Sequence, residues 1–299
     1  MSVPGPNGAP VSATSERGRP PVVIIGMHRS GTSMMSRALE AAGLFLGWRQ
    51  LAGHQEAKYF LRLNVWLLAQ TSSGWEQPDD VDYLLNRPDA RAMVAEYLRA
   101  AMRAPRAVSF LGPARMARVR SIEKMDEPWG WKDPRTTFTL PVWLDVFPDL
   151  KVVHVYRHGV DVAESLRVRQ YEIEGIGLDR ARKFARTDAF RFKPNELVPG
   201  LRFAHLDEGF SLWERYTERA QDAVRRLGDR AFELRYEDFL DDPTSTTSAL
   251  AEFCGLPDAG AARRTVADVK PDRAFAHRRT PELLDFAQKH ADRLATFGY

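Results

Sequence analysis

The chain has 299 residues, of which 44% are hydrophobic, and it carries a formal net charge of +3 with a pI of about 9.0. This length and apolar content suit one large globular domain, and so small a charge gives no indication of a nucleic-acid partner. Cys254 is the single cysteine of the sequence, which excludes an internal disulfide and a cysteine-ligated metal site, and no apolar run of 18 or more residues predicts a membrane span.

The first segment, residues 1–20, is rich in Pro, Gly, Ser and Ala. It lacks the apolar stretch of a secretory signal, so it predicts a disordered tail on a cytoplasmic protein. Residues 21–299 are then expected to form a single domain.

The first predicted strand covers residues 22–25, a β-branched run bounded by Pro21 and Gly26, which is typical of a buried parallel strand. A loop and an amphipathic helix ending near Gly43 follow. The free N–H groups and the dipole at the start of a helix form a natural anion site. The loop adds a cation, a glycine and hydroxyl groups, and it therefore predicts binding of a phosphate-like group by Arg29, Ser30, Gly31, Thr32 and Ser33.

This loop nearly matches the phosphate-binding motif G-x-x-x-x-G-K-[ST], with glycines at Gly26 and Gly31 and a hydroxyl at Ser33. Thr32 occupies the lysine position, and the cation stands earlier, at Arg29. Since that lysine contacts the β- and γ-phosphates of a nucleoside triphosphate, its absence argues against a kinase or NTPase. A P-loop kinase or NTPase and a non-enzymatic nucleotide-binding protein remain the alternatives.

The next predicted elements lead to a second strand. Residues 53–69 are expected to contain a helix with Phe60 and three leucines on one face, and residues 88–103 predict another helix. Residues 129–132 predict a short strand that ends at Lys132. Residues 138–147 predict a helix in which Pro141 marks a start.

A second arrangement for binding an anion follows. Residues 151–156 predict a buried strand, and residues 160–170 predict a helix. Arg157 leaves the end of the strand, and Ser165 lies eight positions later, two turns into the helix. Both side chains can therefore converge on one anion at the carboxyl edge of a sheet, where the arginine fork suits a phosphate.

The pattern weakens over residues 171–206, which contain three glycines and two prolines, and we expect an excursion that forms an acceptor-side insertion. Residues 210–227 then predict a helix, residues 231–236 a strand and residues 244–254 a helix that buries Cys254. Alternating strands and helices predict an α/β, P-loop-like fold with three layers, a central parallel sheet and a helical insertion.

Two of these segments resemble motifs of sulfotransferases that use 3′-phosphoadenosine 5′-phosphosulfate (PAPS). The loop MHRSGTSMM is similar to their 5′-phosphosulfate loop P-[KR]-[ST]-G-[ST]-[ST], with His28 where proline is usual. Arg157 and Ser165 have the separation of the 3′-phosphate motif. The order of motifs in the second segment resembles that of tyrosylprotein and bacterial sulfotransferases. It runs from K-D-P through F-P-x-x-K and a strand to RHGVDVAESLRVR.

The resemblance implies transfer of a sulfuryl group from PAPS to a hydroxyl, which leaves 3′-phosphoadenosine 5′-phosphate (PAP), without a metal. The acceptor would be a small molecule, a glycan or a peptide: a carbohydrate, a lipid-linked or secondary metabolite, or a peptide tyrosine. Lys132 of K-D-P would lie near the transferring group. The residues implied to bind PAPS are Arg29, Ser30, Gly31, Thr32, Ser33, Arg157, Ser165, Arg169 and Tyr236.

The catalytic base is expected between residues 53 and 64. This segment resembles the G-x-x-E…LN segment of bacterial sulfotransferases, and a glutamate in this region is the base in several branches. Glu56 is therefore the first candidate, against the alternative of a solvent-facing glutamate on a helix. His54 is the second, because cytosolic sulfotransferases use histidine and imidazole titrates in a useful range.

Overall fold

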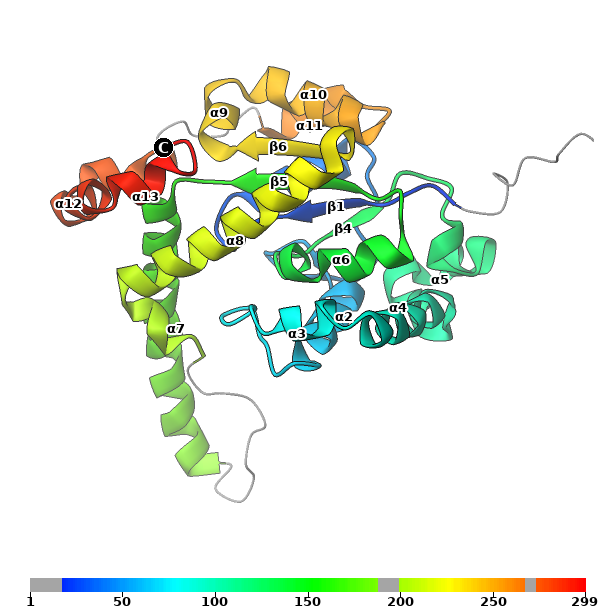
Figure 1. Cartoon of the computed structure of the whole chain (residues 1–299), viewed down its shortest axis with the longest axis horizontal. Helices are drawn as coiled ribbons and strands as arrows, with labels where there is room; N and C mark the ends of the chain where they lie inside the picture. The colour runs from blue at the N-terminus through cyan, green and yellow to red at the C-terminus, as the bar shows by residue number, and fades with distance from the viewer. Residues whose placement is uncertain (1–17, 188–198, 267–272) are drawn as a thin grey trace, which may run out of the picture.

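The computed structural model describes residues 18–187, 199–266 and 273–299 of the chain, so the predicted tail lies almost entirely outside the described residues. The centre is a four-stranded parallel sheet in the order β4-β1-β5-β6 (Figure 1). Its strands are β1 (Val22–Ile25), β4 (Gly130–Lys132), β5 (Lys151–Tyr156) and β6 (Ala231–Arg235). A separate antiparallel pair joins β2 (Gln50–Leu51) to β3 (Glu56–Ala57).

The helices surround this sheet. In chain order they are α1 (Thr32–Ala41), α2 (Lys58–Ala69), α3 (Val81–Leu85), α4 (Pro88–Arg103), α5 (Val108–Val119), α6 (Thr136–Val146), α7 (Gly159–Thr187), α8 (Leu206–Leu227), α9 (Tyr236–Asp241), α10 (Pro243–Cys254), α11 (Ala259–Val266), α12 (Pro281–Lys289) and α13 (Ala291–Ala295).

The core forms on both faces of the sheet because β1 is apolar at every position. Val23 pairs with Trp131 of β4 on one side and with Val152 of β5 on the other. Val22 and Ile24 pack with α1, α10 and α11, whereas the alternate residues Val23 and Ile25 pack with α2, α4 and α6. Helices α6 and α8 cross the face of the sheet that is turned to the viewer in Figure 1. The fold is therefore an α/β sandwich of three layers, as the alternation of elements predicted.

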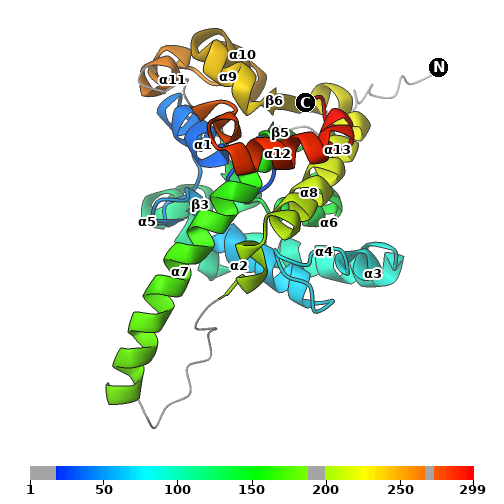
Figure 2. The ribbon, with the colours of Figure 1, turned by 90° about the vertical axis from the view of Figure 1, so that its left-hand side faces the viewer.

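Two predicted boundaries are wrong. Helix α7 does not end at Gln170 but continues to Thr187 and projects from the body of the molecule (Figures 1 and 2). Gln170 donates to Glu174 one turn on, at 3.1 Å, and the glycines at 175 and 177 each cost only about 1 kcal/mol of helix stability. The first half of the predicted excursion is thus helical, and residues 188–198 lie outside the described residues. Pro141 lies inside α6 rather than at its start, because α6 begins at Thr136.

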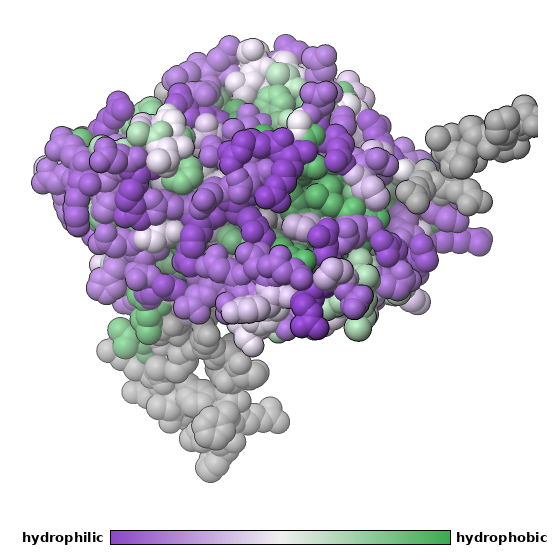
Figure 3. All heavy atoms as spheres, viewed as in Figure 1, coloured by the Kyte–Doolittle hydropathy of each residue, from purple (hydrophilic) through white to green (hydrophobic). Residues whose placement is uncertain are grey.

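The surface and the cysteine agree with a globular protein. The face in Figure 3 is mostly hydrophilic, and hydrophobic residues are exposed at its lower left, where α7 leaves the body with exposed Val168, Ile176 and Leu178. None of the helices within the described ranges has the length and apolarity needed to cross a membrane. Cys254 is buried, and burial raises the pKa of its thiol to about 12, so it is a packing residue at neutral pH.

Candidate active site

A cationic cavity of about 650 Å³ opens at the carboxyl edge of β1, β4 and β5. Among the described residues that line it, Glu56 supplies a carboxylate, and lysine and arginine are far more numerous. Such a concentration of positive charge suits a ligand with several anionic groups. The basic residues of the lining are Arg29, Arg37, Lys132, Arg135, Arg157, Arg169 and Arg273.

The loop between β1 and α1 forms one wall of this cavity. Gly31 precedes α1 with a φ of 93°, no side chain caps the helix, and a Cβ at Gly31 would lie 2.5 Å from the ring of Tyr236. Only glycine fits this position, and the first N–H groups of α1 stay available. The Ser30 hydroxyl is buried without a hydrogen-bond partner among the described residues. The loop therefore offers unused donors to an anion.

The structure brings the two predicted anion-binding motifs together. Arg29 Nε donates a hydrogen bond to Ser165 Oγ at 2.8 Å, although the two residues are 136 positions apart in the sequence. Arg169, one turn further along α7, lines the same cavity and lies 5.7 Å from the ring of Trp75. Desolvation and then the charge of Arg169 lower the pKa of Arg29, as expected where cations are crowded together.

Arg157 lies at the end of β5, with its guanidinium 5.1 Å from the centre of the Tyr236 ring. Its Nη2 donates to the carboxylate of Asp161 at 3.0 Å and to the carbonyl of Arg273 at 2.9 Å. Its Nε is buried without a partner among the described residues. The Arg157 guanidinium is thus held through Nη2, and its Nε remains available to a ligand.

The two candidate catalytic residues form a buried ion pair. Lys132 Nζ lies 3.0 Å from Glu56 Oε1 and 3.1 Å from the carbonyl of His54. Glu56 belongs to β3 and is 4% exposed, so the alternative of a solvent-facing glutamate on a helix is wrong. The His54 side chain is exposed, and desolvation lowers its pKa below the ordinary value. The carboxylate and the ammonium are thus in contact at the floor of the cavity.

A buried polar network supports this pair. Asn64 donates to Asp133 Oδ2 at 2.8 Å and accepts hydrogen bonds from Thr139 and Trp143, both at 2.8 Å. Asp133 Oδ1 accepts from the backbone N–H and Nη1 of Arg135, each at 3.0 Å, and Arg135 Nη1 lies 3.7 Å from Glu56 Oε2. Burial raises the pKa of Asp133. Arg135 was not among the predicted site residues, and its position directly after Lys-Asp-Pro was the available signal.

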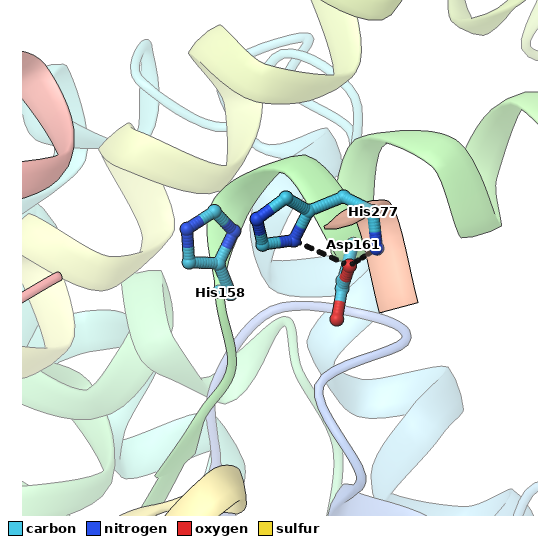
Figure 4. A group of neighbouring side chains, drawn as sticks. All are labelled: His158, Asp161 and His277. Carbon is cyan, nitrogen blue, oxygen red and sulfur yellow. Dashed lines mark hydrogen bonds and ion pairs between the residues drawn. The ribbon is translucent and has the colours of Figure 1, made fainter. Parts of the chain in front are cut away.

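A second buried cluster lies behind Arg157, where His158, Asp161 and His277 come together (Figure 4). The two imidazole rings are stacked, with centroids 4.0 Å apart and planes 16° apart. Asp161 Oδ1 accepts from the N–H of His277 at 2.8 Å and from its Nδ1 at 2.9 Å. Burial opposes ionisation of Asp161, but the bonds from His277 and the charge of Arg157 outweigh it and lower the pKa to about 2.

This cluster predicts an acid-sensitive fold. Burial, followed by the charge of His277, lowers the pKa of His158 to about 3. Below pH 6.5 His158 is therefore protonated in the unfolded chain but neutral in the folded protein. The free energy of unfolding consequently falls as the pH falls toward 3. We expect wild type to lose about 2 kcal/mol more unfolding free energy than His158→Phe between pH 7.5 and 5.0, as measured by urea unfolding. Equal losses in the two proteins would contradict this assignment.

The chain is similar to several known proteins. Solved structures similar to this chain include a sulfotransferase domain from the curacin biosynthetic pathway (16% identity, 86% of this chain and 80% of that chain, TM-score 0.45) and a sulfotransferase from Alicyclobacillus acidocaldarius (18%, 94% and 96%, 0.45). A third is the sulfotransferase domain of the Synechococcus PCC 7002 olefin synthase (17%, 87% and 80%, 0.43). No curated protein matches the chain significantly. A family model described as "Sulfotransferase family" matches residues 20–260, and the chain therefore belongs to the sulfotransferase family.

Proposed function

We propose that this sulfotransferase takes the sulfuryl group from PAPS and transfers it to a hydroxyl acceptor. One observation carries the proposal. The two predicted anion-binding motifs line the same cationic cavity and are in contact there, through the 2.8 Å hydrogen bond from Arg29 to Ser165. When bound, PAPS would supply the activated sulfuryl group and a stable leaving group.

The residues of the cavity fit a ligand with two separated anionic ends. The β1–α1 loop, with Arg29, Thr32, Ser33 and the unpartnered Ser30 hydroxyl, would hold the 5′ end. Arg157 and Ser165 would hold the 3′-phosphate, where Arg157 Nε is a donor that no other described residue uses. A donor that is buried without an acceptor destabilises the fold, and an anionic ligand would supply the missing acceptor.

The chemistry of the pair at the cavity floor follows from its charges. Lys132 Nζ can neutralise negative charge that develops on the leaving oxygen, because its ammonium is buried and shielded from water. Glu56 can take the proton of the acceptor hydroxyl once Lys132 turns from the carboxylate to the donor. Asp133 and Arg135 would hold Glu56 in place during this exchange.

The acceptor is a carbohydrate, a lipid-linked or secondary metabolite, or a peptide tyrosine, and a panel of these incubated with labelled PAPS would decide among them. A kinase or NTPase is disfavoured by Thr32 at the lysine position of the loop. ATP in place of PAPS in the same assay would test that alternative.

The preference for a 3′-phosphate tests the donor. We expect calorimetry to show that PAP binds much more tightly than 5′-AMP, and that Arg157→Ala weakens PAP by about 30- to 150-fold, or 2–3 kcal/mol, because it removes a charge-assisted contact. Arg167→Ala is a matched control, since Arg167 is an arginine of the same helix region that is paired with Glu164 and Glu282. Equal affinity of wild type for PAP and 5′-AMP would contradict the assignment of Arg157 and Ser165 to a 3′-phosphate.

A further inference from the structure

The carboxylate of Asp161 connects the cavity to a distant segment of the chain. Asp161 lies four residues after Arg157, in the first turn of α7, and its side chain is 1% exposed. Oδ2 accepts from Arg157 Nη2 at 3.0 Å and from the N–H of Ala276 at 3.1 Å. Oδ1 accepts from the N–H and Nδ1 of His277 at 2.8 and 2.9 Å. One side chain thus joins Arg157 to the segment of residues 273–277.

These contacts use the whole capacity of the carboxylate. An ionised carboxylate has about four acceptor sites, and four donors fill them here. The stacked rings of His158 and His277 also hold their nitrogen lone pairs in nearly parallel planes, which do not point at one common ion. The cluster in Figure 4 is therefore built as a clamp between protein groups rather than as a metal site.

The clamp acts on two cations of the cavity. Arg157 Nη2 donates to Asp161 and to the carbonyl of Arg273, which fixes the plane of the guanidinium, and Nε is buried with no partner in the part of the chain that the structure describes. Arg273 itself lines the cavity and belongs to the segment that Asp161 holds through Ala276 and His277. Without the clamp, both cations would have to be ordered by the ligand, and that ordering would weaken binding.

We propose that Asp161 is a positioning residue that orients Arg157 and holds Arg273 beside it, and that it thereby sets the preference of the cavity for a 3′-phosphate. This proposal rests on the proposed use of PAPS. Two effects of the carboxylate oppose each other, because its negative charge also repels a nearby phosphate. Its saturation by four donors, one of them the Arg157 cation, offsets most of that charge, so positioning is the larger effect.

The test compares PAP and 5′-AMP binding to wild type and Asp161→Asn by calorimetry. An asparagine offers one acceptor oxygen and an NH₂ group that faces N–H donors, so it cannot hold both sides of the clamp. We expect PAP affinity to fall about tenfold or more and 5′-AMP affinity to change less than about twofold. Hydrogen exchange at the amides of Ala276 and His277 should become faster.

Glu282→Gln is the matched control. Its carboxylate also connects α7 to the C-terminal part of the chain, through Arg167 at 2.8 Å, but it is exposed and outside the cavity. It should leave the ratio of PAP to 5′-AMP affinity unchanged. If Asp161→Asn does not fold, as judged by circular dichroism, His277→Ala removes one donor of the clamp and should weaken PAP alone by about threefold.

The outcomes separate this proposal from the proposed function. The positioning role is overturned if wild type prefers PAP and Asp161→Asn or His277→Ala keeps the full preference or binds PAP more tightly. That result leaves PAPS as the donor. A wild type without any preference for PAP overturns both. A selective loss of PAP affinity in the clamp variants, with faster exchange at residues 276 and 277 and no effect of Glu282→Gln, supports the role of Asp161.

Discussion

Glu56→Gln is expected to lower sulfuryl transfer by roughly 10²-fold or more, with PAP binding and the fold retained. The amide keeps the size of the carboxylate, and its oxygen can still accept the hydrogen bond from Lys132, but it cannot take a proton from the acceptor. Turnover of labelled PAPS with one fixed acceptor, measured across pH, is the assay.

The control for this substitution is His54→Asn. The His54 side chain is exposed, and its backbone carbonyl, which the substitution leaves in place, makes the contacts with Lys132 and Ser33. The effect should therefore be milder. Near wild-type turnover in Glu56→Gln with an inactive His54→Asn would reverse the two roles. If neither variant loses activity, the base lies elsewhere in the chain.

The stability of Glu56→Gln must be measured alongside, because the substitution leaves a buried ammonium without its carboxylate. Removing one partner of a buried ion pair can cost about 3–5 kcal/mol. Urea unfolding of the variant, with and without PAP, separates a loss of folded protein from a loss of chemistry. A catalytic role requires the rate per folded molecule to fall.

Lys132→Met should lower turnover by roughly 10²- to 10³-fold and change PAP affinity far less. Methionine keeps the apolar stem of the side chain and removes the charge. The ammonium would act mainly when negative charge develops on the leaving oxygen, so its loss should appear in the rate. Single-turnover kinetics and calorimetry with PAP measure the two quantities separately.

Lys58→Met is the matched control, since Lys58 is exposed at the start of α2, two residues from Glu56. It should leave both quantities unchanged. If Lys132→Met weakens PAP as much as it slows turnover, Lys132 contributes uniform binding. Unchanged turnover would return Lys132 and Asp133 to a structural role.

The elements of the sheet were predictable because each depends on a short stretch of sequence. The run at 22–25 is apolar at every position, which only a strand covered on both sides accommodates, and the run at 151–156 is rich in β-branched valine; both form central strands. The glycine at position 31 likewise carries its own signal, because the turn before α1 requires a positive φ. The family also followed from such local motifs, and the family model confirms it.

The elements whose boundaries were wrong depend on weaker local signals. The glycines near position 175 suggested a break in α7, but each costs only about 1 kcal/mol of helix stability, and the helix continues through them to Thr187. Pro141 suggested a helix start, whereas the tertiary packing of α6 between α4 and α8 tolerates it in the interior.

The sequence by itself determined the parallel α/β fold, the family and the identity of the residues that could contact an anion, because these follow from periodicity and from motifs within a few residues. Only the tertiary structure decided which of these residues meet. It placed Glu56 on a short strand against Lys132, added Arg135 to that pair, and joined Asp161 to His277 across 116 positions. Contacts between distant segments depend on how helices and strands pack in three dimensions, and no local pattern of side chains records that packing.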